Sequence, residues 1–138
     1  MHQLHLDCGI QEYAIIGGGT LRFNPGDPNL YARFLNAVET VSVMEKELQE
    51  QAAALPAGDP ASAIRLMAEA DTRLKTLLTQ VFGEGNDFHK VLGGVSLLAV
   101  AGNGQRVITN LLNILEPLLS EGAQKLVDAR AEALGEQL

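Results

Sequence analysis

The sequence is poor in aromatic side chains. It contains no tryptophan, and only 4% of its residues are aromatic. Every aromatic residue lies at or before Phe88. The core of the last third must therefore be built from leucine, valine, isoleucine and alanine. The overall balance, with 46% hydrophobic and 20% charged residues, is nevertheless typical of a globular chain and not of a disordered one. It favours a helix-rich domain.

Cysteine and positive charge are also scarce. Cys8 is the only cysteine, which excludes an internal disulfide and suits a reducing compartment. Ten basic residues stand against 17 acidic ones, for a net charge of −7. The basic residues form no run, so the sequence does not predict a nucleic-acid partner.

Long hydrophobic runs are missing as well. No apolar run approaches the roughly 20 residues that span a bilayer. The first residues lack the basic segment and apolar stretch of a secretory signal. We therefore expect an intracellular protein without a membrane partner. Its 138 residues suffice for one domain with a real core.

The N-terminal region predicts a tail and a β-hairpin. Residues 1–10 carry weak structural signals, and we expect a disordered tail there. Residues 13–16 and 20–23 are β-prone and flank three glycines, which supply the positive φ values of tight turns. Because an isolated two-stranded hairpin is marginal in water, this one must pack on helices or pair with another chain.

Two Asp-Pro pairs predict two long helices. Asp27-Pro28 and Asp59-Pro60 each place an N-cap residue before a proline at the first helical position. The first helix is expected to reach about Ala54, and the second to end at Gly83, a natural C-cap. A short connection between them favours an antiparallel pair. Apolar side chains recur along both at alternating steps of three and four: Leu30, Phe34, Ala37, Val41, Met44 and Leu48, then Ile64, Met67, Leu74, Leu78 and Val81.

The last third is punctuated by glycine. We expect a short helix over 87–92 with Asn86 as its N-cap. Residues 95–101 are nearly all apolar and fit a buried helix or a strand, of which we favour the helix. A leucine-rich helix from about Gln105 is apolar on more than one face, and Pro117 should kink or end it. The expected division is one helical domain over 11–120 and a weakly ordered C-terminal helix over 121–138.

Motifs for cofactor or metal chemistry are incomplete. Gly102-Asn103-Gly104 follows an apolar run and precedes a helix, which is the order of a dinucleotide fingerprint. However, Val107 stands where the third glycine belongs, so we interpret the segment as a turn. A metal site could use side chains of the tail, but a closed site needs four ligands on a rigid frame. The tail offers His2, His5, Asp7 and Cys8.

A catalytic constellation is not recognisable either. His89 is the only histidine outside the tail, and no serine lies in a nucleophile elbow. Asp71 falls on the seam of the second helix, where a carboxylate needs a partner. We expect it to pair with Arg33 or Arg73, or to sit at a frayed end of the seam. The sequence thus predicts no enzyme, no metal and no cofactor.

The remaining candidate for a functional feature is apolar surface. The excess of apolar residues between positions 95 and 119 is either core or a face for a partner. An acidic chain that presents such a face suits a chaperone, because its charge discourages nonspecific association. The candidate partner-binding residues are Val95, Leu97, Leu98, Val107, Leu111 and Leu115.

Several short motifs carry a resemblance to a known family. They are Phe23-Asn24-Pro25 before the first helix, Tyr31-Ala32-Arg33-Phe34 within it, Val81-Phe82-Gly83 after the second, and Asn110-Leu111-Leu112 in the last. With Gly93 and the Gly102-x-Gly104 turn, this order over residues 11–119 resembles the small tail assembly chaperones of long-tailed phages and of prophages in Gram-positive bacteria. A family proline soon after that turn is replaced here by Gln105 or Arg106.

The resemblance implies a function. Such a chaperone binds the long, aggregation-prone tape measure protein in the host cytoplasm until the tail tube assembles around it. It implies a mainly α fold, a helical bundle with a long antiparallel helix pair and a short N-terminal β-hairpin. Two alternatives stay open: a self-assembling phage structural or tail component that forms homo-oligomers, and a small enzyme or nucleotide-binding module that uses the Gly102 turn.

Overall fold

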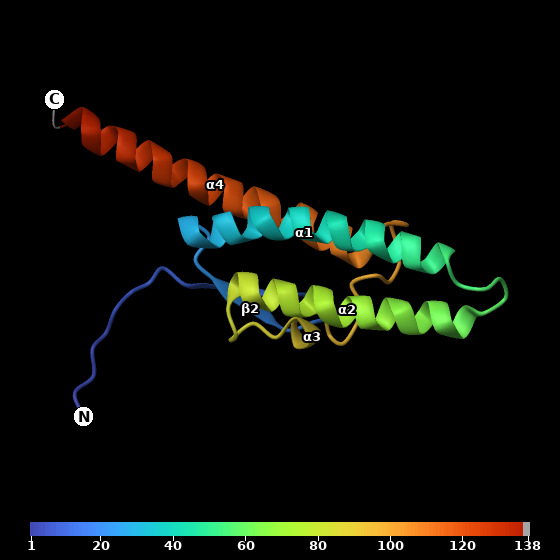
Figure 1. Cartoon of the computed structure of the whole chain (residues 1–138). Helices are drawn as coiled ribbons and strands as arrows, with labels where there is room; N and C mark the ends of the chain where they lie inside the picture. The colour runs from blue at the N-terminus through green and yellow to red at the C-terminus, as the bar shows by residue number, and fades with distance from the viewer. Residues whose placement is uncertain (137–138) are drawn as a thin grey trace.

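The computed structural model describes the backbone of residues 1–136 and the side chains of residues 1–132. The predicted mainly α fold with an N-terminal hairpin is confirmed. Two strands precede four helices along this part of the chain (Figure 1). They are β1 (Gln11–Ala14), β2 (Thr20–Phe23), α1 (Pro28–Ala53), α2 (Pro60–Phe82), α3 (Phe88–Val91) and α4 (Val107–Glu136).

The helix starts are where the Asp-Pro pairs predict them. Asp27 Oδ1 accepts a hydrogen bond from the backbone N–H of Asn29 at 2.9 Å, and Asp59 Oδ1 accepts one from that of Ser62 at 3.1 Å. The Ser62 hydroxyl donates a second bond to Asp59, and together these bonds lower the pKa of the Asp59 carboxyl. Both caps satisfy N–H groups that a helix start leaves free.

Helices α1 and α2 form the predicted antiparallel pair (Figure 1). The α1 seam is buried apart from Met44, which is partly buried, and the α2 seam is buried from Ala70 onward. The prediction was wrong for Ile64 and Met67, which are exposed. No described element covers that side of the first turns of α2, so its apolar spacing there does not mark core.

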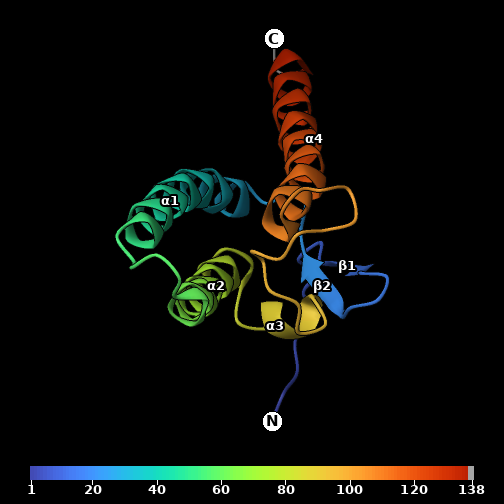
Figure 2. The ribbon, with the colours of Figure 1, turned by 90° about the vertical axis from the view of Figure 1, so that its right-hand side faces the viewer.

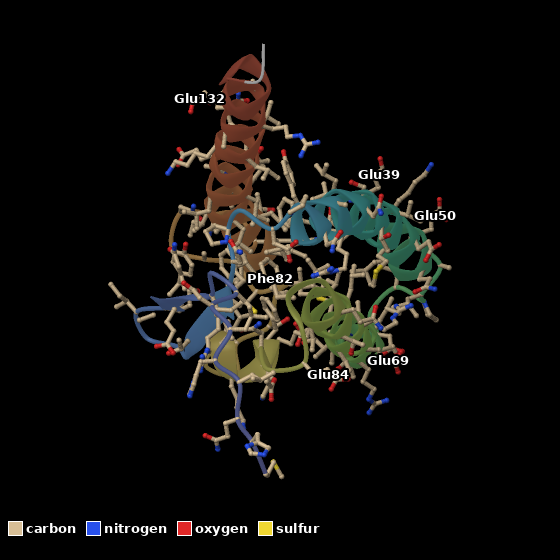
Figure 3. The ribbon with its side chains drawn as sticks, turned by 90° about the vertical axis from the view of Figure 1, so that its left-hand side faces the viewer. Glu39, Glu50, Glu69, Phe82, Glu84 and Glu132 are labelled. Atoms are coloured by element: carbon tan, nitrogen blue, oxygen red, sulfur yellow. The ribbon has the colours of Figure 1, made fainter. Side chains whose placement is uncertain are left out.

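The hairpin docks on the helices through aromatic rings. The rings of Tyr13 and Phe23 stack with centroids 4.7 Å apart, and Phe23 meets Phe82 edge-on at 5.2 Å. Phe88 lies 5.6 Å beyond Phe82. Figure 3 shows Phe82 among the elements of the body, while the labelled glutamates lie around the outside. Aromatic contacts of this geometry add to the stabilisation from area burial alone.

Asn86 ties the hairpin to the end of α2. Its Oδ1 accepts the backbone N–H of Arg22 at 2.8 Å, and its Nδ2 donates to the carbonyls of Arg22 and Phe82 at 2.8 and 2.9 Å. The side chain is 3% exposed. The predicted N-cap role of Asn86 was wrong, because Asp87 caps α3.

The hairpin turn rests on α3 by a close approach of two backbones. The Gly19 N–H donates to the Val91 carbonyl at 3.0 Å. A β-carbon at Gly18 would collide with that same carbonyl, although Gly18 has no positive φ. Glycine is needed here for space, and Gly17 alone of the three supplies a positive φ, of 84°.

Residues 95–101 form neither of the predicted elements. They make turns, closed by a single bridge between Val100 and Arg106. The favoured helix was wrong because the backbone groups of this segment bind elsewhere. The Leu97 N–H donates to Asp71 Oδ1 at 2.8 Å, and the Leu97 carbonyl accepts from the Ile108 N–H at 2.9 Å. The loop thus provides a cap for α4.

Helix α4 runs through Pro117 as one element from Val107 to Glu136. Of the two predicted effects of Pro117, a kink or an end of the helix, the end was wrong. Proline removes the hydrogen bond to the Asn113 carbonyl, but both residues are exposed, so water can satisfy that carbonyl. Beyond Ala123 every described side chain of α4 is exposed, and Figure 2 shows this end projecting from the body. Positions 137–138 of the predicted C-terminal helix lie outside the described residues.

Residues 1–10, predicted as a tail, contain no helix or strand, and all ten side chains are exposed. Figure 1 shows them leading away from the body. Within residues 1–136, no helix combines the length and apolarity that crossing a membrane requires.

Gly122 is where α4 crosses the loop after β2. A β-carbon there would overlap the Pro25 carbonyl. Alanine improves helix propensity by about 0.5–1 kcal/mol, but overpacking against backbone costs about 1–3 kcal/mol. We expect Gly122→Ala to lower the free energy of unfolding in urea titrations. Gly102→Ala, which meets nothing within 4 Å, is the control. Equal stability of the two variants would contradict the close approach.

Asn86→Ala should destabilise the chain by at least about 2 kcal/mol, because it leaves one buried donor and two acceptors without partners. Chemical denaturation measures the loss, and Asn103→Ala, on an exposed turn, is the control. A loss no larger than that of the control would show that the Asn86 bridge does not hold the hairpin.

Candidate functional site

An apolar groove lies between the β-hairpin and α4, and we name it the hairpin groove. Its volume is about 290 Å³. Its lining is apolar apart from the Asn110 amide and the Tyr13 hydroxyl. The lining consists of Tyr13, Ala14, Ile15, Leu21, Phe23, Leu92, Val107, Asn110, Leu111, Ile114, Leu115 and Leu118.

The floor and the rim of the groove come from two stripes of α4. Leu111 and Leu115 are buried and form part of the core. Ile114 and Leu118, one helical turn apart on the neighbouring stripe, form the rim; Leu118 is partly buried and Ile114 is 62% exposed. An exposed isoleucine over an apolar hollow is the kind of surface that a partner side chain covers.

A second hollow of about 450 Å³ adjoins the groove toward the projecting end of α4. Besides polar residues such as Asn24, Glu121 and Lys125, its lining includes Leu118, Gly122 and Leu126. The last three follow Ile114 at steps of four, so they lie on one side of the helix. Leu126 is exposed. Gly122 has no side chain and lies against the Pro25 carbonyl, so the apolar side chains of this stripe are not continuous beyond Leu118.

The outer edge of β1 borders the groove and is unpaired. Tyr13 pairs with Leu21, and Ile15 bonds to Gly19, so the alternation of an antiparallel ladder turns Glu12 and Ala14 away from β2. Arg22, which the same alternation turns outward on β2, is bonded by Asn86. The β2 edge is therefore bonded at Arg22, whereas on the β1 edge the N–H and C=O groups of Glu12 and Ala14 have no protein partner among residues 1–132.

The six sequence-predicted binding residues do not form one exposed surface. Four of them are buried core residues: Leu97, Leu98, Leu111 and Leu115. Of these four, Leu111 and Leu115 also line the floor of the hairpin groove. Val107 is partly buried at the groove, and Val95 is exposed outside the groove lining. The apolar character of the four buried residues therefore indicates core, which was one of the two alternatives for the apolar residues between positions 95 and 119.

Sequence reasoning missed the residues that form the rim. Ile114 and Leu118 share a stripe with Val107 at heptad-like steps, so the second apolar face of α4 was a usable signal. Tyr13 had no comparable signal, because its place beside α4 depends on how the hairpin docks.

A cluster of polar side chains from α2 and α3 lies outside the lining of the hairpin groove. Lys75 is 8% exposed, and its Nζ lies 2.9 Å from Asp71 Oδ2 and 3.2 Å from His89 Nδ1. Asp71 Oδ1 accepts the Leu97 N–H at 2.8 Å. The predicted pairing of Asp71 with Arg33 or Arg73 was wrong.

The cluster opens on a hollow of about 750 Å³ that His89 and Ser96 help to line. Its groups are already engaged with one another, since Lys75 has a counterion and the second carboxylate oxygen of Asp71 holds the loop backbone. Satisfied buried networks of this kind rigidify a fold. Here the network joins α2, α3 and the loop before α4.

The other predicted chemistry stays dispersed. The tail side chains of His2, His5, Asp7 and Cys8 are all exposed. Among the described residues, no three His, Cys, Asp or Glu side chains gather in a group that could hold a metal ion. Gly102 lies in an exposed turn, as its sequence predicts.

Comparisons with family models, with curated proteins and with solved structures found no match to this chain.

We expect Asp71 and Lys75 to be energetically coupled. Asp71→Asn leaves the Lys75 ammonium buried without a counterion, and Lys75→Met leaves the carboxylate with only the Leu97 N–H. Each single variant should destabilise strongly, because removing one partner strands the other charge. The double variant should lose less than the sum, by at least about 1 kcal/mol. Urea denaturation of the four chains measures this, and strict additivity would contradict the pairing.

Proposed function

We propose that this chain is a non-enzymatic tail assembly chaperone of a phage or prophage, which binds and solubilises the tape measure protein in the host cytoplasm. The observation that carries the proposal is the hairpin groove, an apolar hollow whose rim residue Ile114 is 62% exposed. The motifs that resemble the family supply the identity of the partner.

The surface suits a partner of low sequence specificity. The groove offers mostly apolar contact, with the Asn110 amide and the Tyr13 hydroxyl as its polar groups, so binding depends mainly on covered area and less on directional recognition. Such a surface can cover different apolar segments of a long chain in turn. The net charge of −7 keeps the loaded complexes from associating with one another.

A second candidate function is a self-assembling phage structural or tail component. The unpaired edge of β1 and the projecting end of α4 favour it, because both are surfaces on which further copies could add. A structural component would form large assemblies without a partner, whereas the chaperone stays small and responds to one.

The experiment is co-expression with the tape measure protein encoded in the same genome. We expect this chain to move that protein into the soluble fraction and to co-elute with it. Ile114→Asp should abolish both effects, because it places a charge on the groove rim. Its matched control is Asn113→Asp, the adjacent exposed residue of α4, which lies outside the groove lining.

Three results would count against the proposal: no gain in solubility with the unaltered chain, equal loss with both variants, or a large regular assembly of the chain alone. The last would favour the structural component. Thermal unfolding of both variants establishes that each remains folded.

A further inference from the structure

Residues 1–10, which we name the arm, have the pattern of a strand that lacks a sheet. Apolar residues occupy alternate positions, with polar residues or glycine between them. The apolar positions are Leu4, Leu6, Cys8 and Ile10, and those between are Gln3, His5, Asp7 and Gly9. Alternation of period two is typical of a strand with one covered face. In this chain the face is uncovered, since Leu4 and Leu6 are 95% and 83% exposed.

The same chain contains a place of matching chemistry. The outer edge of β1 offers the free N–H and C=O groups of Glu12 and Ala14. A strand added there would place alternate side chains on the face that carries Tyr13 and Ile15, over the hairpin groove. The arm therefore has what the edge needs: backbone groups without partners, and leucines at every second position.

We propose that the arm of one copy adds as a strand to β1 of a second copy, with its apolar side chains over the hairpin groove. The exchange pairs the free backbone groups of β1 and covers the groove. It does not depend on the proposed function, because it rests on the arm, the β1 edge and the groove alone.

The connection between arm and β1 argues against pairing within one copy. The arm enters β1 directly at Ile10, so it would have to reverse at Gly9 to lie beside its own strand. Instead, Asn24 Nδ2 donates to the Cys8 carbonyl at 2.9 Å, and the Gly9 N–H donates to Asp7 Oδ1 at 2.8 Å. These bonds hold the junction while the arm leads away from the body (Figure 2). A second copy has no such constraint.

Charge also favours the arm as the occupant. The chain carries a net charge of −7, but the arm contributes one carboxylate, Asp7, together with His2 and His5. A second acidic body therefore repels this segment less than it repels the acidic outer faces of the helices. The arm can approach the groove of another copy where a more acidic segment could not.

The test is the association state of the full chain, measured by sedimentation velocity over a range of concentrations. We expect a reversible dimer. Leu4→Asp should raise the dimer dissociation constant at least about tenfold, because it places a charge on the face that covers the groove. Gln3→Asp adds the same charge one residue away, on the opposite face, and should leave the dissociation constant nearly unchanged.

A mixing experiment separates donor from acceptor. Ala14→Pro removes an outward N–H from the β1 edge without breaking the hairpin ladder, so it should also raise the dissociation constant. The mixing is done at a concentration at which each variant alone is monomeric. Neither variant alone has an intact pair, but the Leu4→Asp chain still has an intact edge and the Ala14→Pro chain an intact arm. A mixture of the two should therefore form a heterodimer, in which the arm of the Ala14→Pro chain pairs with the β1 edge of the Leu4→Asp chain.

Three outcomes would overturn the proposal. One is a chain that stays monomeric at all concentrations, whether or not hydrogen exchange protects its arm. Another is a dimer that Leu4→Asp does not weaken relative to Gln3→Asp. The third is a mixture that stays monomeric although each variant alone is a folded monomer.

Discussion

The docking of the hairpin on the helices is the interaction on which the rest of the structure depends. Two short strands cannot hold themselves together in water. Here the Phe23 ring packs against Phe82, and Asn86 bonds both backbone groups of Arg22. These contacts bond the β2 edge at Arg22 and leave the β1 edge open beside α4. The groove lies between that open edge and α4.

The long helices could be predicted from the sequence because their signals are local. Asp27 and Asp59 cap the helices that they directly precede. Two of the wrong predictions concern residues whose hydrogen-bond partners lie far away in the sequence. Asn86 has a typical N-cap sequence, but Arg22 binds it from 64 positions away. Residues 95–101 look helical, but Asp71 and Ile108 take the backbone groups of Leu97. No local pattern encodes these contacts.

The predicted binding residues overlap the hairpin groove in part, since Val107, Leu111 and Leu115 line it and Val95, Leu97 and Leu98 do not. Leu111 and Leu115 were chosen for their apolar character, and that character places them in the core. Whether an apolar helical face is core or surface depends on what packs against it. The hairpin covers one stripe of α4 and stops short of Ile114. Which residues of α4 form the rim of the groove thus depends on where the hairpin docks, which spacing along α4 cannot reveal.

We propose, above all, that the groove beside Ile114 holds another polypeptide. Site-specific photo-crosslinking tests it most directly, with the crosslinking side chain placed at position 114 or, as the comparison, at position 113. With the tape measure protein co-expressed, we expect position 114 to crosslink to that protein and position 113 to give little product. Equal yields at both positions, or none at 114 while the two proteins still co-purify, would contradict the claim.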